Sequence, residues 1–328
     1  MKNKIIALIA LLLLPAMTFC SCSSVKEIKS TDEEAKVVGS CGDHDIRYEE
    51  LRYLTMGFKA ELQSKYGEYI FDSADTGAQY EERLWEMVAE ALIENYSLVD
   101  ACAERGIKTN SKTTKKEVKE YVKESVDACG DFDAYKAYLA DNYMTDWVFR
   151  LNTAILSCQG QYYDLLSEEL HKESYDAVMA GEGIIRCMSI FVKNDPGESA
   201  EENRKIAQDV RDQVASGKAL LESFIGKSCN QDTSNCDYYF MRGYFVEEYE
   251  NAAFDLEIGE VSEVVEVSDG FYVIQRMETD PSYISNHVEN LQIQYYLSIM
   301  EEETNRIAES LSVQFNEYGK SIVLWSMK

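Results

Sequence analysis

The side chains that most often carry covalent or metal chemistry do not form an active-site pattern in this sequence. It contains nine cysteines and three histidines, but it has no C-x-x-C pair and no spacing typical of a zinc site. It also lacks a glycine-rich phosphate-binding loop and a Ser–His–Asp signature. A thiol nucleophile would need a neighbouring histidine, and none lies close in sequence to Cys187 or Cys229. We therefore expect no metal site and no hydrolase activity.

Aromatic side chains are the more informative feature. In the segment MRGYFVEEYENAAF, Phe245 and Tyr249 are four residues apart, which is about one turn of a helix. The strand-like apolar run IIRCMSIFV at 184–192 precedes this segment, and strand candidates follow it at 261–267 and 270–276. The two rings therefore lie inside a segment that alternates between strand and helix patterns.

A helix is expected between the first strand and the aromatic segment. Residues 201–216 have a helical apolar pattern, and a polar loop at 226–237 follows. The helix carries apolar residues four apart and a glycine placed to end it: Ile206, Val210, Val214 and Gly217. The order of the elements predicts a mixed domain in which helices pack on a small sheet.

These segments resemble the parvulin family of peptidyl-prolyl isomerases. The matching segments are RCMSIFVK at the first strand, RGYFVEEYENAAFDLEIGEVSEVV in the middle and DGFYVIQRME at the end. In the middle segment, Arg242-Gly243, Phe254 and Gly259-Glu260 keep the family's spacing without gaps. The resemblance implies a parvulin-like domain at 183–279, with a small antiparallel or mixed sheet flanked by helices.

The resemblance also implies an activity, which is rotation about X-Pro peptide bonds without a cofactor or a covalent intermediate. The uncatalysed barrier is about 18–20 kcal/mol. An apolar site lowers this barrier because the twisted amide is less dipolar than the planar one. Phe245 and Tyr249 match the family's prolyl-pocket positions, and we assign Tyr239 of the YYF run to the same substrate-binding surface.

The polar residues of the family site are replaced in this sequence. The family usually carries a hydrogen-bonded pair of histidines, one on the first strand and one on the last. The matching residues are Ser189 and Tyr272, and the family's Asp or Cys after the second helix matches Cys229 or Asn230. We expect these four residues to supply the polar surround. The alternative is a holdase chaperone whose degenerate parvulin-like domain binds proline-containing clients without isomerising them.

The composition indicates an acidic globular protein. The chain has 328 residues, enough for two or three domains, and a formal net charge of −27. Binding to nucleic acid relies on clustered Lys and Arg, so this charge argues against a nucleic-acid partner. The expected partners are unfolded or newly exported polypeptides that contain X-Pro bonds.

The first residues are typical of a secretion signal. Lys2 and Lys4 precede an apolar run at 5–14 that is too short to span a bilayer. Cys22 follows the small residue Ser21, which fits lipoprotein processing. We expect a signal peptide at 1–22, a tether at 23–36 and an extracytoplasmic protein anchored to the bacterial cell membrane through lipid on Cys22. The alternative is an ordinary cleaved signal that releases a soluble protein.

The next residues resemble the start of the N-terminal region of secreted foldases of the PrsA and SurA kind. The motif VVGSCGDHDIRYEELRY predicts a short strand, a turn at 39–45 and a helix that begins near Arg47. Leu51, Leu54, Phe58 and Leu62 then form a helical stripe. Further helical patterns lie at 80–105, 113–128, 132–140 and 145–171. The region 37–182 is therefore expected to be a mostly helical domain.

The C-terminal residues complete the expected α+β architecture. Pro281 breaks the chain, and 286–318 has the pattern of a long helix. Its apolar stripe consists of Ile307, Leu311, Phe315 and Tyr318. The resemblance suggests that 280–328 packs on the N-terminal domain, so that the parvulin-like domain is an insertion. The alternative is a terminal helix on the nearest surface.

The remaining cysteines are expected to be buried free thiols. Cys102, Cys129 and Cys158 lie within helical patterns. Cys229 and Cys236 flank one loop and could form a disulfide in an oxidising compartment.

Overall fold

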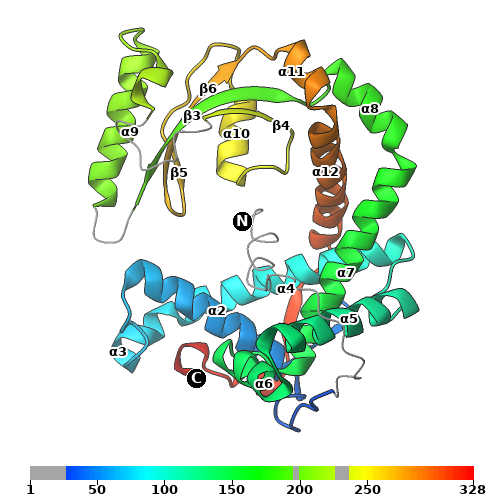
Figure 1. The fold of residues 1–328 in the computed structure, drawn as a ribbon. Helices are drawn as coiled ribbons and strands as arrows, with labels where there is room; N and C mark the ends of the chain where they lie inside the picture. Colours follow the sequence, from blue (N-terminus) through cyan, green and yellow to red (C-terminus); the bar gives the residue numbers. More distant parts are fainter. Residues whose placement is uncertain (1–26, 195–198, 226–235) are drawn as a thin grey trace. The chain divides into compact units, whose positions relative to one another are not determined.

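The computed structural model describes residues 27–194, 199–225 and 236–328 (Figure 1). These residues form two compact units. We call the first, which contains the described residues from 165 to 301, the sheet unit. We call the second, which contains 27–164 and 302–328, the helical unit. The predicted α+β class is confirmed. Among the described residues, no helix is long and apolar enough to cross a membrane.

The sheet unit is built on four antiparallel strands in the order β4-β3-β6-β5. They are β3 (Ile185–Lys193), β4 (Asp237–Phe240), β5 (Val265–Val267) and β6 (Gly270–Met277). The central pair of strands, β3 and β6, is aligned over its full length, from Arg186 opposite Met277 to Lys193 opposite Gly270. This long pairing makes β3 and β6 the scaffold on which the other elements are placed.

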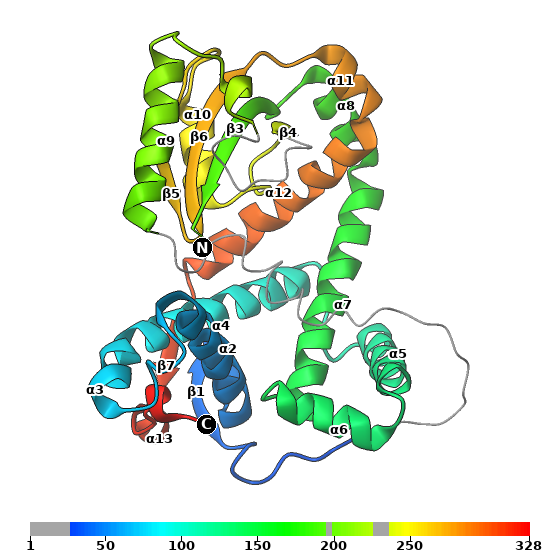
Figure 2. The same cartoon turned by 60° about the vertical axis from the view of Figure 1, so that its left-hand side comes forward.

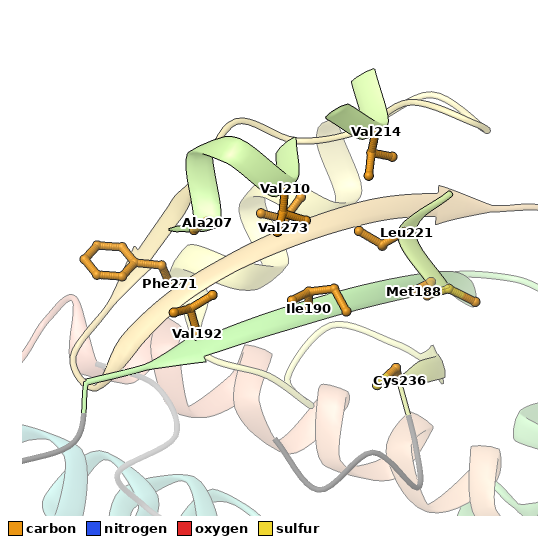
Figure 3. Close-up of a cluster of buried hydrophobic side chains, with 10 residues drawn as sticks. All are labelled: Met188, Ile190, Val192, Ala207, Val210, Val214, Leu221, Cys236, Phe271 and Val273. Carbon is orange, nitrogen blue, oxygen red and sulfur yellow. The ribbon is translucent and has the colours of Figure 1, made fainter. Parts of the chain in front are cut away.

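One face of this sheet is covered by α9 (Ala200–Ala215) (Figures 1 and 3). Successive side chains of a strand point to opposite faces, so alternate residues of β3 and β6 belong to this core. Figure 3 shows Val210 of α9 packed near Val273 and above Ile190. The predicted apolar stripe of α9 is correct at Val210 and Val214, which are buried, but wrong at Ile206, which is 41% exposed. Ala207 is buried in its place.

The other face of the sheet is covered by α10 (Glu247–Asp255). The buried residues here come from the three strands β3, β4 and β6 and from the helix: Ile185, Cys187, Phe240, Tyr249, Ala253 and Ile274. A third core joins β4 to three helices: α8 (His171–Ala180), α11 (Pro281–Asn286) and the first part of α12 (Val288–Ala308). A short 3-10 turn, η2 (Leu221–Phe224), follows α9.

Within the described residues, the helical unit contains a small sheet, seven α-helices and two 3-10 helices. The sheet has the order β2-β1-β7. Its strands are β1 (Val37–Cys41), β2 (His44–Arg47) and β7 (Val313–Phe315). The longer helices are α2 (Tyr48–Tyr66), α4 (Glu81–Glu104), α5 (Lys112–Cys129), α6 (Phe132–Asp141) and α7 (Asp146–Glu169). The shorter segments are α3 (Ala74–Gly77), η1 (Ala78–Tyr80), α13 (Glu317–Lys320) and η3 (Leu324–Ser326).

The helical predictions agree closely with these elements. All four residues of the stripe in α2, from Leu51 to Leu62, are buried. The side chain of Thr145 accepts a hydrogen bond from the Val148 amide at 3.2 Å, as expected of a residue that caps the start of a helix.

The hairpin at the start of the helical unit was predicted incorrectly. We expected a turn at 39–45, but β1 continues to Cys41 and β2 begins at His44. Only Gly42 and Asp43 form the turn, and Gly42 has φ of 55°. The strand β2 was missed because it has four residues and only Ile46 is buried.

The predicted helix at 286–318 was also wrong beyond Ala308. Residues Val313–Phe315 form β7, which pairs with β1 instead of continuing α12. The four-residue spacing of Leu311 and Phe315 fits a helix, but pairing with a strand more than 270 residues away overrides it. Likewise Pro281 begins α11 rather than only breaking the chain, because proline is well tolerated in the first turn of a helix.

Two further boundaries differ from the predictions. The helix expected at 145–171 is divided into α7 and α8 at Leu170. The strand expected at 261–267 is limited to Val265–Val267, and Val261 forms an isolated bridge with Gln275.

Candidate functional site

The predicted site residues lie in an aromatic cluster between α10 and the sheet. The ring of Tyr249 is at its centre, with ring centroids 4.4 Å from Phe245 and 4.9 Å from Tyr272. Tyr272 stacks in turn on Phe191 at 4.4 Å. Aromatic rings at these separations attract one another beyond their contribution to apolar burial. The cluster is therefore a continuous apolar surface that runs from the loop before α10 across two strands.

The strands position one side of this cluster. Tyr272 and Phe191 are direct partners in the antiparallel register of β3 and β6, so their rings lie on the same face. Ser189 is two residues from Phe191 on the same strand and shares that face. The register of the two central strands thus places Ser189 and Tyr272 on the same face of the sheet, at diagonal positions.

The loop before α10 positions Phe245, and a buried carboxylate holds this loop. Glu250 is 6% exposed, and its two carboxylate oxygens accept hydrogen bonds from three consecutive amides. The donors are the amides of Gly243 at 3.0 Å, Tyr244 at 2.8 Å and Phe245 at 2.9 Å. Gly243 has φ of 91°, a conformation that favours glycine. The backbone of Phe245 is therefore fixed by an ionic acceptor rather than by packing alone.

Two hydroxyl groups beneath the cluster lack hydrogen bonds. The Ser189 Oγ and the Tyr249 hydroxyl are both buried, and neither has a hydrogen-bond partner of normal geometry among the described residues. Burial raises the pKa of Tyr249 far above its ordinary value, and the neighbouring Ser189 hydroxyl partly opposes this shift. A buried polar group without a partner costs about 1–3 kcal/mol. Because two such groups lie side by side here, we consider below whether they have a role in the function of the site.

The Tyr272 phenol and the Cys187 thiol are neutral at physiological pH. Burial, with a smaller contribution from Asp269, raises the pKa of Tyr272 to about 12. Burial also raises the pKa of the Cys187 thiol to about 12. A thiol with this pKa is a poor nucleophile because the thiolate is the reactive form. The site therefore offers apolar surface and hydroxyl groups, but no general base for neutral pH.

Tyr239 does not belong to this cluster. It lies on the opposite face of β4, where its ring stacks on Tyr283 at 3.8 Å and its hydroxyl accepts a hydrogen bond from the Asp280 amide at 3.1 Å. Neighbouring residues of a strand point to opposite faces, so Tyr238 and Phe240 take the place that we assigned to Tyr239. The Tyr238 ring lies 5.2 Å from Phe245. Alternation from the buried Phe240 could have identified Tyr238 from the sequence.

The members of the cluster differ in exposure. Tyr249 has no exposed surface, whereas Phe245, Tyr238 and Tyr272 are half-buried and Tyr244 is 49% exposed. Tyr249 is thus the buried floor of the cluster. The half-buried rings of Phe245, Tyr238 and Tyr272 are the part of the cluster that solvent or a ligand can reach.

Several predicted residues lie outside the described part of the chain. These are Cys22, Cys229 and Asn230. Cys41, Cys102, Cys158 and Cys187 are buried free thiols, Cys129 is a partly exposed free thiol, and Cys236 is buried. The described residues contain no group of three or more His, Cys, Asp or Glu side chains able to hold a metal ion.

The sheet unit has a four-stranded antiparallel sheet with α9 on one face and α10 on the other, which agrees with the small sheet flanked by helices that the resemblance implied. Residues 190–278 match the family described as the PPIC-type PPIase domain, or rotamase. Peptidyl-prolyl cis-trans isomerase ESS1 of Saccharomyces cerevisiae is 30% identical over 129 residues, which cover 34% of this chain and 72% of that protein. The chain therefore belongs to the PPIC-type, or parvulin, family of peptidyl-prolyl cis-trans isomerases.

Longer similarities extend beyond this domain. Foldase protein PrsA of Caldanaerobacter subterraneus subsp. tengcongensis is 25% identical over 281 residues, covering 84% of this chain and 82% of that protein. The crystal structure of foldase protein PrsA from Streptococcus pneumoniae is 14% identical, with 84% of this chain and 90% of that chain covered and a TM-score of 0.36.

Proposed function

We propose that this protein is an extracytoplasmic foldase whose sheet unit isomerises X-Pro bonds in unfolded, exported polypeptides. The observation that supports the proposal is the packed cluster of Phe245, Tyr249 and Tyr272, in which Phe245 and Tyr249 occupy the positions matched to the family's prolyl pocket. Exchange of X-Pro bonds takes tens to hundreds of seconds without a catalyst, so an isomerase that acts on emerging chains removes a slow step of folding.

In this proposal the half-buried rings bind the proline. The prolyl ring packs against Phe245 and Tyr272, while Tyr249 supports both rings from below. The surrounding side chains exclude water from the peptide group. Because the twisted amide is less dipolar than the planar amide, an apolar environment lowers its free energy relative to the ground state. No bond to the protein forms or breaks.

Ser189 and Tyr272 match the family's histidine pair, and we propose that the Ser189 hydroxyl, together with the neighbouring buried hydroxyl of Tyr249, supplies the polar groups beneath the rings. The Ser189 and Tyr249 hydroxyls are each a donor and an acceptor without a partner of normal geometry among the described residues. Such groups can fix the orientation of the aromatic rings by hydrogen bonding as a substrate binds. Cys229 or Asn230 is proposed to complete the polar surround.

The second candidate function is a holdase chaperone that binds clients without isomerising them. It is favoured by the replacement of both family histidines and by the complete burial of Tyr249. The rate of isomerisation of a short proline peptide, followed by NMR exchange, distinguishes the two functions. We expect a rate enhancement that falls at least tenfold in Phe245→Ala, equivalent to about 1.4 kcal/mol of transition-state stabilisation. If the native protein gives no enhancement but still suppresses aggregation of an unfolded client, the holdase function is correct.

We further propose that Cys22 carries lipid and anchors the protein to the cell membrane. The apolar run after two lysines, followed by Ser21 and Cys22, supports this proposal. Cys22→Ser is expected to abolish incorporation of a labelled fatty acid and to release the protein from the membrane fraction. Labelling that persists in this variant would overturn it.

A further inference from the structure

An aromatic patch lies on the helical unit, apart from the site described above. It consists of Tyr66, Tyr69, Phe71 and Tyr80, in the connection from α2 to α4. Tyr69 is 71% exposed and Tyr66 is 53% exposed, the two largest values for aromatic side chains in the part of the chain that the structure describes. The Tyr80 ring lies 5.7 Å from Tyr66 and 5.6 Å from Phe71, so these three rings form one cluster, and Tyr69 is exposed in the same connection. Contiguous exposed apolar surface is a feature of interaction sites.

The backbone that carries this patch is well connected by hydrogen bonds. The Gly67 amide donates to the Gln63 carbonyl at 2.9 Å, and the Gln63 side chain donates to the Glu68 carbonyl at 2.6 Å. The Asp72 amide donates to the Tyr69 carbonyl at 3.1 Å. Binding to rings that are already held in place costs less conformational entropy than binding to a flexible loop.

The chain below the patch is held by the C-terminal residues of the same unit. Gly77 of α3 packs against Trp325, and a Cβ at this glycine would approach the indole ring to 2.5 Å. The Glu81 carboxylate accepts hydrogen bonds from the amides of Leu324 and Trp325, both at 2.9 Å. Figure 2 shows α3 near the C-terminal segment. The segment that follows the patch residues is therefore held in place by packing and hydrogen bonds to the C-terminal residues.

The charge around the patch is strongly negative. Residues 59–86 contain seven acidic and three basic side chains, a net charge of −4. The acidic residues are Glu61, Glu68, Asp72, Asp75, Glu81, Glu82 and Glu86, and the basic ones are Lys59, Lys65 and Arg83. This charge repels anionic lipid surfaces and attracts cationic segments.

The rings of the patch already bind cations within the chain. The Lys59 Nζ lies 5.0 Å from the centre of the Phe71 ring, and the Lys65 Nζ lies 5.5 Å from the centre of the Tyr66 ring. A cation over an aromatic face contributes about 0.5–1 kcal/mol at an exposed site. Tyr69, the most exposed ring, provides further surface for the same interaction.

We propose that this patch is a second polypeptide-binding surface, which takes unfolded segments rich in Lys or Arg and in apolar side chains and does not require proline. Aromatic rings supply the apolar contact, and the acidic residues around them select for positive charge. The surface would hold basic segments of a client independently of the isomerase site.

The proposal is tested by binding of fluorescent peptides to the full chain. The probe is an unstructured peptide in which Lys, Leu and Phe are interspersed with Gly and Ser in an irregular order without proline, and its control has Glu in place of every Lys. We expect the Lys peptide to bind and the Glu peptide not to bind. Tyr66→Ser/Tyr69→Ser is expected to weaken binding about tenfold or more, since exposed aromatic anchors dominate such interfaces. Glu68→Gln/Asp72→Asn is expected to reduce the salt dependence of binding.

Tyr175→Ser is the matched control, because Tyr175 is 45% exposed on α8 of the sheet unit. It should leave peptide binding unchanged. The tyrosines replaced are mostly exposed, so far-UV circular dichroism should show an unchanged fold in every variant. Equal binding of the Glu peptide, or an unchanged affinity in the double tyrosine variant, would overturn the proposal. Binding of zwitterionic lipid vesicles in place of the Lys peptide would overturn it as well.

Discussion

Ser189 and Tyr249 place two hydroxyl groups in an apolar core without hydrogen-bond partners among the described residues. Removing a buried unsatisfied group usually stabilises a protein, by up to about 1–3 kcal/mol. If the pair serves catalysis, the same change should also slow isomerisation. We therefore predict that Ser189→Ala and Tyr249→Phe each raise the midpoint of thermal unfolding and lower the isomerase rate several-fold. Calorimetry and the proline-peptide assay measure the two effects; a stabilised variant with an undiminished rate would show that the pair has no catalytic role.

The same residues predict how the isomerase rate depends on pH. The aromatic cluster contains no histidine, and the pKa of Tyr272 is raised to about 12, mainly by burial. A site that relied on imidazole would change between about pH 5 and 8. We expect the rate constant kcat/KM to be flat over this range. A bell-shaped profile would mean that a titratable group outside the cluster takes part.

A second titration is predicted for the helical unit. Glu50 is 3% exposed, and burial raises its pKa from 4.5 to about 7, although hydrogen bonds from the Tyr96 hydroxyl at 3.0 Å oppose the shift. Its folded pKa is higher than its unfolded pKa. The folded state therefore keeps a proton that the unfolded state loses, and stability falls as pH rises from about 4.5 through about 7, by about 3 kcal/mol in all.

Glu50→Gln should remove this loss. The free energy of unfolding is measured at each pH by urea denaturation, with tryptophan fluorescence as the signal. This signal reports on the helical unit, because all three tryptophans lie in it. Glu82→Gln, an exposed residue of α4, is the control and should keep the pH dependence of the native chain. An identical pH dependence in Glu50→Gln and the native chain would contradict the prediction.

At the scale of elements, Glu250 links α10 to the loop before it. Its carboxylate accepts three backbone hydrogen bonds, the last from Phe245. In Glu250→Gln an amide NH₂ would face backbone N–H donors, so we predict a loss of about 1–3 kcal/mol in stability. We also predict a lower isomerase rate, because Phe245 is then less well positioned. Glu248→Gln has the same change in charge on an exposed residue of the same helix and should alter neither property.

The sequence predicted elements well where local pattern and tertiary structure agree. The strand β3, the helix α9 and most of the N-terminal helices follow from periodicity, because each buries one continuous face. The strand β7 could not be predicted this way, because only its pairing with β1 makes it a strand. The site was partly predictable. The family's positions indicated Phe245 and Tyr249, but the face of Tyr239 depends on the register of β4, and the hydrogen bonds of Glu250 require a loop conformation that periodicity does not specify.

At the scale of the whole molecule, the helical unit is closed by residues from both ends of the described chain. The strand β7 pairs with β1, and the Lys59 Nζ donates hydrogen bonds to the carbonyls of Trp325 at 2.8 Å and Met327 at 2.6 Å. The unit thus depends on residues that follow the sheet unit in sequence. A defect at the pairing of β1 and β7 should therefore destabilise the N-terminal helices.

Substitution of Gly39 by alanine, which adds one Cβ atom, tests whether the helical unit depends on the pairing of β1 and β7. A Cβ at Gly39 would lie 2.5 Å from the Gln314 carbonyl oxygen and 3.0 Å from the Phe315 Cα, whereas a Cβ at Gly57 of α2 has no atom within 4 Å. We predict that Gly39→Ala lowers the free energy of unfolding, measured by tryptophan fluorescence, by about 1–3 kcal/mol, because backbone must move to relieve the overlap. Gly57→Ala should instead raise it by up to about 1 kcal/mol, as alanine does in a helix. If the two variants unfold alike, β7 does not close the helical unit in solution.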